Sequence, residues 1–346
     1  MFKPKRFACF LVAIALPLSA WAQNPYQSRN MHFGVSGGNI NDISKAFCCS
    51  GTLGSLLTNG TTRYILSNNH VLARVDQAVA GEDISQPGLI DNGCRPATIV
   101  ADYTRAVVMG NNVDAAIAQL RSGTMDSTGF IEGIGTISST TATPTVGMAV
   151  IKSGRTTGTT TANIASVNTS VKVQYQKGCN SGKKFTISYT NQVLINSSTF
   201  SAGGDSGSLI LSNDGVFHPV ALLFAGSSST TIANPINEVL SKLGGGLSFV
   251  GSSSSGGPHA ATTGGQQTVQ VSQASLAHAK KVLAEHRYRL MSRSAVLGVG
   301  VGAADKAGKA AIVLYVNKGV SLRSPLPKRL NDVSVKVHMT DPFVAR

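Results

Sequence analysis

A succession of short apolar segments, separated by turn residues, constrains the fold of this chain more than any other feature. Glycine, serine, threonine and asparagine fill the intervals between the segments. Few stretches have the period of a long amphipathic helix, whereas many short strands with turn signals are typical of an all-β sandwich or barrel. The segments that we interpret as strands are residues 47–57, 63–67, 97–101, 115–120, 149–152, 171–175, 185–189, 192–195, 209–211 and 220–224.

The first residues have the pattern of a secretory signal peptide. Lys3, Lys5 and Arg6 precede an apolar run over 7–18, and an Ala-x-Ala cleavage pattern ends at Ala22. The apolar run is too short to span a bilayer comfortably, although an uncleaved anchor is the alternative. We expect cleavage after Ala22, export to the periplasm or the medium, and no transmembrane segment in the mature chain.

Changes in composition divide the 346 residues further. A polar stretch without periodicity follows the signal peptide, and a Gly/Ser-rich stretch separates the β-rich body from an alanine-rich, charged end. In that end we expect one helix over 274–291 and three strands over 295–301, 310–316 and 333–337. The predicted parts are a signal peptide at 1–22, a leader at 23–44, a β-rich domain at 45–250, a flexible linker at 251–271 and a basic α+β module at 272–346.

The positive charge is concentrated in the C-terminal module. The whole chain has a formal charge of +14, and residues 272–346 hold 13 basic and 4 acidic residues. Such a charge favours contact with an anionic partner, for example an envelope polymer, nucleic acid or an acidic protein. The alternative is a solvated basic face on a module that only adds stability.

Four cysteines remain after removal of the signal peptide: Cys48, Cys49, Cys94 and Cys179. An even number in an exported protein predicts disulfides, and four cysteines allow three pairings. Adjacent cysteines in a strand point to opposite faces, so Cys48 and Cys49 need different surroundings. The spacing does not suit a zinc site, and we expect neither a metal nor another cofactor.

A glycine-rich loop with one central serine is the strongest functional signal. Glycines flank Ser206 on both sides within 203–207, and Asp205 precedes it. Glycines allow a tight turn that can direct the N–H groups of Gly204 and Ser206 at a common point, where an oxyanion could bind. The alternative is an ordinary surface turn, so the interpretation depends on partners elsewhere in the chain.

A serine nucleophile needs a nearby base, and His70 is the best candidate. It follows a predicted strand directly, where its side chain can face a cleft. His32 lies in the predicted leader, and His218 lies in a turn before a proline. We therefore assign His70 as the base, with a purely structural histidine as the alternative.

The base in turn needs a carboxylate that orients it, and Asp114 is placed where a polar loop becomes an apolar strand. A carboxylate buried there requires a partner, because an unpaired buried charge is costly. Asp91 and Asp102 are alternatives, although both have the sequence context of turn residues. Asp114 would hold the ring of His70 and stabilise its cationic form.

These stretches together resemble chymotrypsin-fold serine proteases. The order His, Asp, Ser and the gaps of 44 and 92 residues match that family. The resemblance implies two six-stranded β-barrels with the active site between them. The segments that carry the resemblance are 52–56, 67–71, 113–118, 152–158, 203–207, 224–226 and 233–236, and it covers about residues 45–245.

The same resemblance implies roles for individual residues. His70 would act as base and then acid, Asp114 would orient it, and Ser206 would attack the substrate. The oxyanion would bind to the N–H groups of Gly204 and Ser206. The backbone of the segment Phe224, Ala225 and Gly226 would pair with a substrate strand.

Other positions bear on specificity and activation. Phe200 and Ser201 stand at the expected base of the specificity pocket, where no acidic residue would receive Lys or Arg, so we expect a small or apolar substrate side chain. No histidine occupies the strand before Phe224, which argues against the glutamate-specific branch. The chain has no Ile-Val-Gly-Gly segment, so pairing of a new N-terminus with Asp205 is not expected.

The function predicted from the sequence is therefore an exported serine endopeptidase that forms an acyl-enzyme on Ser206. A second interpretation is a catalytically idle barrel that binds its target, with the basic module docked on an anionic polymer or protein. A third is self-cleavage, near Pro258 in the linker or before Asn41. The module at 272–346 is similar to a Val-Gly-Val-Gly strand module that accompanies some bacterial trypsin-like domains. The sequence predicts no oligomeric state.

Overall fold

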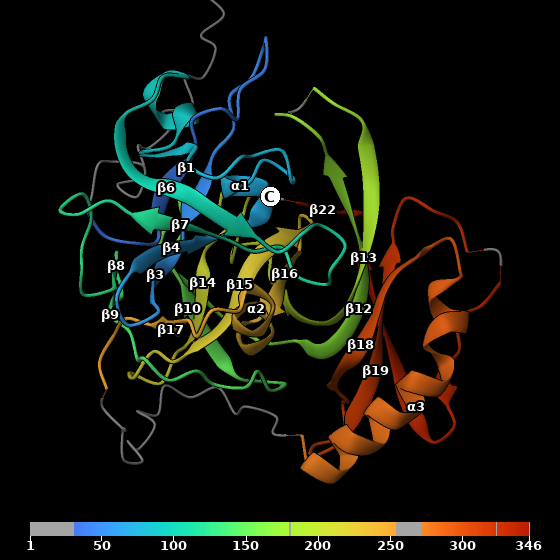
Figure 1. Cartoon of the computed structure of the whole chain (residues 1–346). Coiled ribbons are helices and arrows are strands. Elements are labelled where there is room, and N and C mark those ends of the chain that lie inside the picture. Colours follow the sequence, from blue (N-terminus) through green and yellow to red (C-terminus); the bar gives the residue numbers. More distant parts are fainter. Residues whose placement is uncertain (1–30, 180, 254–270, 323, 346) are drawn as a thin grey trace, which may run out of the picture.

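The computed structural model describes residues 31–179, 181–253, 271–322 and 324–345 (Figure 1). The predicted signal peptide and most of the predicted linker lie outside these residues. Two β-barrels and a C-terminal α+β layer confirm the predicted fold class, a chymotrypsin-like double β-barrel with a small additional module. Within the described ranges no helix has both the length and the apolarity to cross a bilayer.

The first barrel is built from the segments before residue 121. Its elements are β1 (Val35–Asn39), β2 (Gly51–Leu53), β3 (Ser55–Thr58), β4 (Arg63–Ser67), α1 (Asn69–Leu72), β5 (Asp83–Gln86), η2 (Leu89–Asn92), β6 (Thr98–Ala106) and β7 (Ala116–Leu120). The strand order is β3-β4-β7-β6-β5-β1-β2, and the late strand β17 (Ser248–Phe249) pairs with β3. Only Gly54 separates β2 from β3, so one bent strand pairs with both β1 and β4 and closes the barrel.

Gly54 also fixes how the two barrels meet. A side chain at this position would lie 2.1 Å from the carbonyl oxygen of Gly207, in the serine-containing loop of the second barrel. Only glycine permits so close an approach of two backbones. The short hairpin of β8 (Phe130–Ile131) and β9 (Gly135–Thr136) lies on the connection between the barrels.

The second barrel closes in the same way. Its elements are β10 (Ala149–Lys152), β11 (Thr160–Asn163), β12 (Ser166–Gln176), β13 (Lys184–Asn196), β14 (Leu209–Ser212), β15 (Pro219–Gly226), β16 (Thr230–Pro235) and then α2 (Ile236–Leu243). The order is β11-β10-β14-β15-β16-β13-β12, and β11 runs almost directly into β12. The hairpin of β12 and β13 extends beyond the barrel because both strands are long.

The C-terminal module continues the second sheet. Its elements are α3 (Gln273–Met291), β18 (Val296–Ala303), β19 (Ala310–Asn317), β20 (Arg329–Leu330), β21 (Val333–Thr340) and β22 (Phe343–Ala345). β18 pairs with β12, and the order continues β18-β19-β21-β20. Helix α3 begins where the Ser272 side chain accepts a hydrogen bond from the Ser275 N–H, and it covers β18 and β19 (Figure 1).

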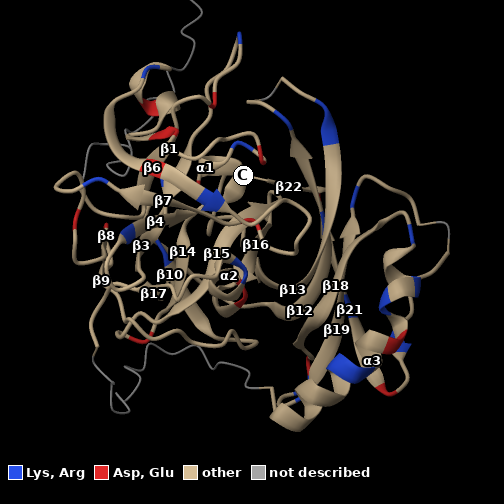
Figure 2. Ribbon diagram, in the orientation of Figure 1, with Lys and Arg blue, Asp and Glu red and all other residues tan. Residues whose placement is uncertain are grey.

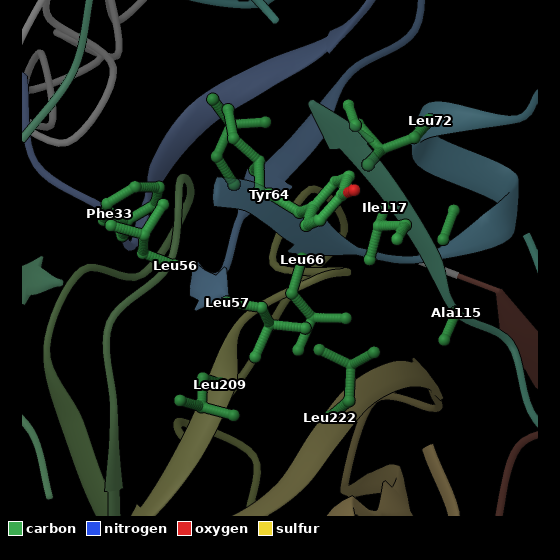
Figure 3. Packing of buried hydrophobic residues seen from close by; sticks show 14 of the residues in the cluster. Phe33, Leu56, Leu57, Tyr64, Leu66, Leu72, Ala115, Ile117, Leu209 and Leu222 are labelled. Carbon is green, nitrogen blue, oxygen red and sulfur yellow. The ribbon is translucent and has the colours of Figure 1, made fainter. Parts of the chain in front are cut away.

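Two large cores follow this division. In the first, Leu57 and Leu66 of the first barrel lie near Leu209 and Leu222 of the second, so the barrels share apolar contacts (Figure 3). The second core joins the second barrel to the module through side chains such as Val282 and Leu283 of α3. Full burial of such a side chain contributes about 1.5–3 kcal/mol, so the module is packed onto the barrel by the hydrophobic effect as well as by strand pairing.

The structure corrects the predicted leader at 23–44. Residues 31–44 are not a structureless leader, because Val35–Asn39 is strand β1, buried throughout and paired with β2 and β5. The segment contains two glycines and an asparagine, which are rare in strands, so its own sequence does not indicate one. Residues 23–30 lie outside the described part of the chain.

Other elements differ in detail from the predictions. Residues 185–189 and 192–195, predicted as two strands, form the single strand β13. The C-terminal module has the predicted helix and the three predicted strands, and it also contains the short strands β20 and β22. The cysteines pair as Cys48–Cys94 and Cys49–Cys179, and the second bond ties the first barrel to the turn between β12 and β13.

Candidate active site

His70 lies on the short helix α1, directly after strand β4. Its ring nitrogen Nδ1 is 2.6 Å from Oδ2 of Asp114, and its backbone N–H donates to Oδ1 of the same carboxylate over 3.2 Å. The histidine is therefore held at its backbone and at its ring by one carboxylate. This leaves the other ring nitrogen, Nε2, on the side away from Asp114, which is the arrangement that a general base requires.

Asp114 precedes strand β7 and is fully buried. Its backbone is fixed from both sides, because its N–H donates to Asn234 Oδ1 over 3.0 Å and its carbonyl accepts from Asn68 Nδ2 over 2.7 Å. Its side chain accepts hydrogen bonds from His70 and from Tyr175. The structure thus gives this buried charge the partners that its sequence context required.

Tyr175 is a member of the site that the sequence did not reveal. Its hydroxyl lies 2.9 Å from Asp114 Oδ2 and 2.7 Å from the hydroxyl of Tyr189. Burial raises the pKa of Tyr175 well above its usual value, so the hydroxyl stays neutral and donates to the carboxylate. Tyr189 can then donate to Tyr175. Tyr175 belongs to β12 and Tyr189 to β13, and these two strands pair with each other. The folded position of this hairpin brings the Tyr175 hydroxyl to Asp114, although the two residues are far apart in the sequence.

The loop that contains Ser206 is held by strand β2 and by its own glycines. Thr52 of β2 donates two hydrogen bonds to this loop: its N–H donates to the Ser206 carbonyl over 2.8 Å, and its hydroxyl donates to the Gly204 carbonyl over 3.0 Å. Gly204 has φ of +99°, and a side chain there would lie 2.4 Å from Thr156 Oγ1. The loop conformation therefore requires glycine at this position.

Ser206 itself is fully buried, and its hydroxyl donates to the carbonyl of Phe224 over 3.3 Å. The segment after His70 and the Ser206 backbone meet at Gly51, where a side chain would lie 2.5 Å from Val71 Cγ2 and 2.8 Å from the Ser206 carbonyl oxygen. The structure thus places the histidine helix and the serine loop against the same point of strand β2.

Asp205, the residue before Ser206, fixes the serine loop through its buried carboxylate. Its carboxylate accepts from the N–H groups of Thr156 (2.8 Å) and Ala202 (2.9 Å) and lies 3.6 Å from the ammonium nitrogen of Lys152, with both charged side chains fully buried. The buried Lys152, which the sequence did not single out, thus supplies a cation to Asp205 without a new N-terminus. Burial lowers the pKa of Lys152 to about 8, and the charge of Asp205 partly opposes this shift.

A cavity of about 620 Å³ lies over these groups, lined among others by His70, Tyr175, Gly203 and Gly204. Val344 and Ala345 of β22 line the same cavity. Phe200 is instead fully buried in the second core, and Ser201 is buried with its hydroxyl 2.5 Å from that of Thr231. Phe224, Ala225 and Gly226 form the end of strand β15. The cavity is therefore lined by the predicted base and by glycines of the predicted serine loop. Among the described residues, Asp114, Ser206, Phe200, Ser201 and the predicted substrate segment 224–226 are not part of its lining.

Asp42 is a second residue of the cavity that the sequence did not indicate. Burial raises the pKa of its carboxyl to about 6, and the charges of His70 and Arg74 act in the opposite direction. A carboxylate near the candidate base would change charge close to neutral pH. Asp42 lies in the predicted leader, a polar segment without periodicity, and its sequence context therefore does not distinguish it from a surface residue.

Comparison of the backbone with solved structures finds proteases of low sequence identity. A serine protease described as specific for glutamic acid, with a histidine triad in substrate binding, is 22% identical with a TM-score of 0.46, and the match covers 63% of this chain and 98% of that one. Thermobifida fusca Protease A is 19% identical with a TM-score of 0.43, covering 64% and 100%. The Nocardiopsis protease NAPase is 18% identical with a TM-score of 0.43, covering 64% and 98%. No family model and no curated protein matches the sequence.

Proposed function

We propose that this chain is an exported serine endopeptidase of the chymotrypsin-like type. The observation that carries the proposal is the buried Asp114 carboxylate bonded to the His70 ring, in a cavity that the glycines of the Ser206 loop also line. A serine in a tight glycine-rich loop, a histidine base and a buried carboxylate that orients the histidine are the three parts of an activated serine nucleophile. Two disulfides agree with an extracytoplasmic location.

In the proposed mechanism the Ser206 hydroxyl turns from the Phe224 carbonyl toward His70 and attacks the substrate carbonyl carbon. His70 takes the hydroxyl proton and later gives it to the leaving amine, while Asp114 stabilises the imidazolium form. The N–H groups of Gly204 and Ser206 would bind the oxyanion. Water then attacks the acyl-enzyme while His70 removes a proton from it. The bond between the acyl carbon and Ser206 Oγ breaks, His70 returns the proton to Oγ, and the new carboxylic acid leaves.

The substrate would be a protein or peptide whose strand pairs with Phe224, Ala225 and Gly226 of β15. Backbone pairing with the edge of a strand gives affinity with little dependence on sequence. We further propose that the pocket beside this strand accepts small or apolar side chains. This proposal rests on the family resemblance, because in the structure Phe200 belongs to the second core and Ser201 is bonded to Thr231, so neither of them lines the cavity.

A fluorophosphonate probe tests the proposed function, because it forms a covalent bond only with an activated serine. We expect the wild-type chain to be labelled and to hydrolyse casein, and Ser206→Ala to do neither. Ser208→Ala is the matched control, because Ser208 lies in the same loop, is buried and has no hydrogen-bond partner for its hydroxyl among the described residues. Equal labelling of the wild type and Ser206→Ala would reject the assignment of Ser206 as the nucleophile.

A second candidate function concerns the basic module. Lys280, Lys281 and Arg289 are exposed on α3, and Figure 2 shows basic positions along the ribbon of this helix, together with an acidic one. We propose that α3 can dock an anionic polymer or protein, either beside the peptidase activity or in a barrel that is catalytically idle. Replacing the three residues by alanine should then weaken binding to heparin, used as a model polyanion, and should reduce the salt dependence of binding. Unchanged binding would remove this candidate.

A further inference from the structure

The last strand of the chain occupies the strand edge that the proposed function assigns to the substrate. β22 pairs antiparallel with β15, with Ala345 opposite Ala225 and Val344 opposite Gly226. These two residues of β15 belong to the segment predicted from the sequence to pair with substrate. A strand edge can pair with one strand at a time, so a bound β22 and a bound peptide exclude each other.

β22 also lies in the active-site cavity and not at a distance from it. Val344 and Ala345 line the cavity together with His70 and Gly204. In Figure 1, β22 lies between the β12–β13 hairpin and helix α1, which carries His70. On its other side β22 pairs in parallel with β12, at Val173 and Gln174 next to Tyr175.

The residue before these two anchors the strand. Phe343 is 1% exposed, and its ring centroid lies 6.1 Å from that of Tyr315 in the module. It belongs to a buried cluster that includes Phe224 and Tyr175. The preceding turn is fixed as well, because Thr340 Oγ1 lies 2.6 Å from Ser227 Oγ and Lys318 lies 3.0 Å from Asp341.

The contacts beyond Phe343 are weaker. Val344 is 40% exposed, and the pairing of β22 with β15 involves two residue pairs only. Because Phe343 stays buried, Val344 and Ala345 can leave the edge of β15 while the module remains folded. The arrangement therefore permits displacement without unfolding of the second core.

We infer that β22 is a built-in inhibitor, which occupies the substrate-pairing edge of β15 and must leave it before a peptide can bind. This inference rests on the proposed peptidase function. A tethered segment has an effective concentration in the millimolar range, so a tail with an intrinsic dissociation constant of roughly 0.1 mM would lower kcat/KM about tenfold. The module would then serve to deliver this strand to the cleft.

The test compares four full-length or nearly full-length chains: the wild type, a chain that ends at Phe343, Val344→Pro and Val344→Ala. The truncation keeps the buried anchor, and proline removes the N–H that strand pairing uses. Val344→Ala is the matched control because it shortens the side chain but keeps the backbone pairing. We expect kcat/KM on a chromogenic peptide, and the labelling rate with fluorophosphonate, to rise about tenfold in the truncated chain and in Val344→Pro, and to stay near the wild type in Val344→Ala.

A synthetic peptide with the sequence of residues 340–346 should inhibit the truncated chain competitively. Equal activity of all four chains, together with no inhibition by the peptide, would overturn the inhibitory role and leave the peptidase function standing. If none of the chains is labelled or hydrolyses any peptide, the proposed function itself is wrong and the inhibitory role falls with it. The melting temperature of each chain shows whether Val344→Pro is folded, and the truncated chain decides the matter if it is not.

Discussion

Replacing Tyr175 with phenylalanine removes a single hydroxyl from the buried surroundings of Asp114. That hydroxyl donates to Asp114 Oδ2 over 2.9 Å, and Asp114 is fully buried, so water cannot easily take its place. A hydrogen bond to a charged group contributes about 1.5–3 kcal/mol. If the whole of this free energy is lost in the transition state, kcat/KM falls roughly 10- to 150-fold, since about 1.4 kcal/mol corresponds to a factor of ten.

Tyr189→Phe is the matched control for this prediction. The Tyr189 hydroxyl is 2.7 Å from that of Tyr175, and its removal leaves the bond from Tyr175 to Asp114 in place. We expect it to lower the free energy of unfolding by about 1 kcal/mol, the usual value for a neutral hydrogen bond, and to change kcat/KM by less than about threefold. The two variants therefore separate the orientation of Asp114 from the general stability of the hairpin.

Both variants are best measured in the chain that ends at Phe343, so that β22 does not mask the active site. The assay is steady-state hydrolysis of a chromogenic peptide, with kcat and KM determined separately. Because Tyr175 acts through Asp114, the loss should appear in kcat, with KM changed little. A Tyr175→Phe chain with full kcat, or equal losses in the two variants, would refute the reasoning.

Three further predictions concern stability, measured by urea unfolding. The pKa of Asp42 is raised to about 6 in the folded protein, so the free energy of unfolding falls as pH rises from about 4 to 6. Asp42→Asn lacks this loss. The variant should be more stable than the wild type by up to about 3 kcal/mol at pH 7, and equally stable below about pH 4. The pKa of Lys152 is lowered to about 8, so the unfolded chain binds more protons between pH 8 and 10.5; the wild type should gain up to about 3 kcal/mol over this range, and Lys152→Met should not. Parallel pH profiles of variant and wild type would contradict either prediction. Replacing both cysteines of Cys49–Cys179, which are 130 residues apart, should lower the free energy of unfolding by about 5 kcal/mol by the chain-entropy model. The same change at Cys48–Cys94, which are 46 residues apart, should lower it by about 4 kcal/mol. The reverse order would show that loop closure does not set the difference.

The sequence was sufficient for those parts of the fold and the candidate site whose signals are local. Short apolar strands indicated an all-β sandwich or barrel, the resemblance to chymotrypsin-fold proteases implied two barrels, and glycines around Ser206 indicated a special loop. His70 and Asp114 each stand where a strand meets a polar segment, and the structure joins them by a hydrogen bond. Such positions can be recognised without knowing which strands pair.

The parts that the sequence did not reveal depend on pairing between distant segments. Tyr175 is 61 residues from Asp114 and looks like any residue of an alternating strand, and only the register of β12 brings it to the carboxylate. The sequence of β1 does not predict a strand, because glycine and asparagine are rare in strands. This segment is a strand because it pairs with β2 and β5. β22 has three residues, too few for any periodic pattern. The pairing of the cysteines likewise followed from the three-dimensional arrangement alone.

The pairing of β12 with β18 has a consequence for the order in which this protein folds. Val171 lies opposite Gly298, so the two strands can meet only after more than a hundred intervening residues have been brought together. Contacts between such distant residues make folding slow, because the chain pays the entropy of closing a long loop before it gains the contacts. We therefore expect refolding from urea to be slow, and protection of the β12 amides against hydrogen exchange to appear together with that of β18.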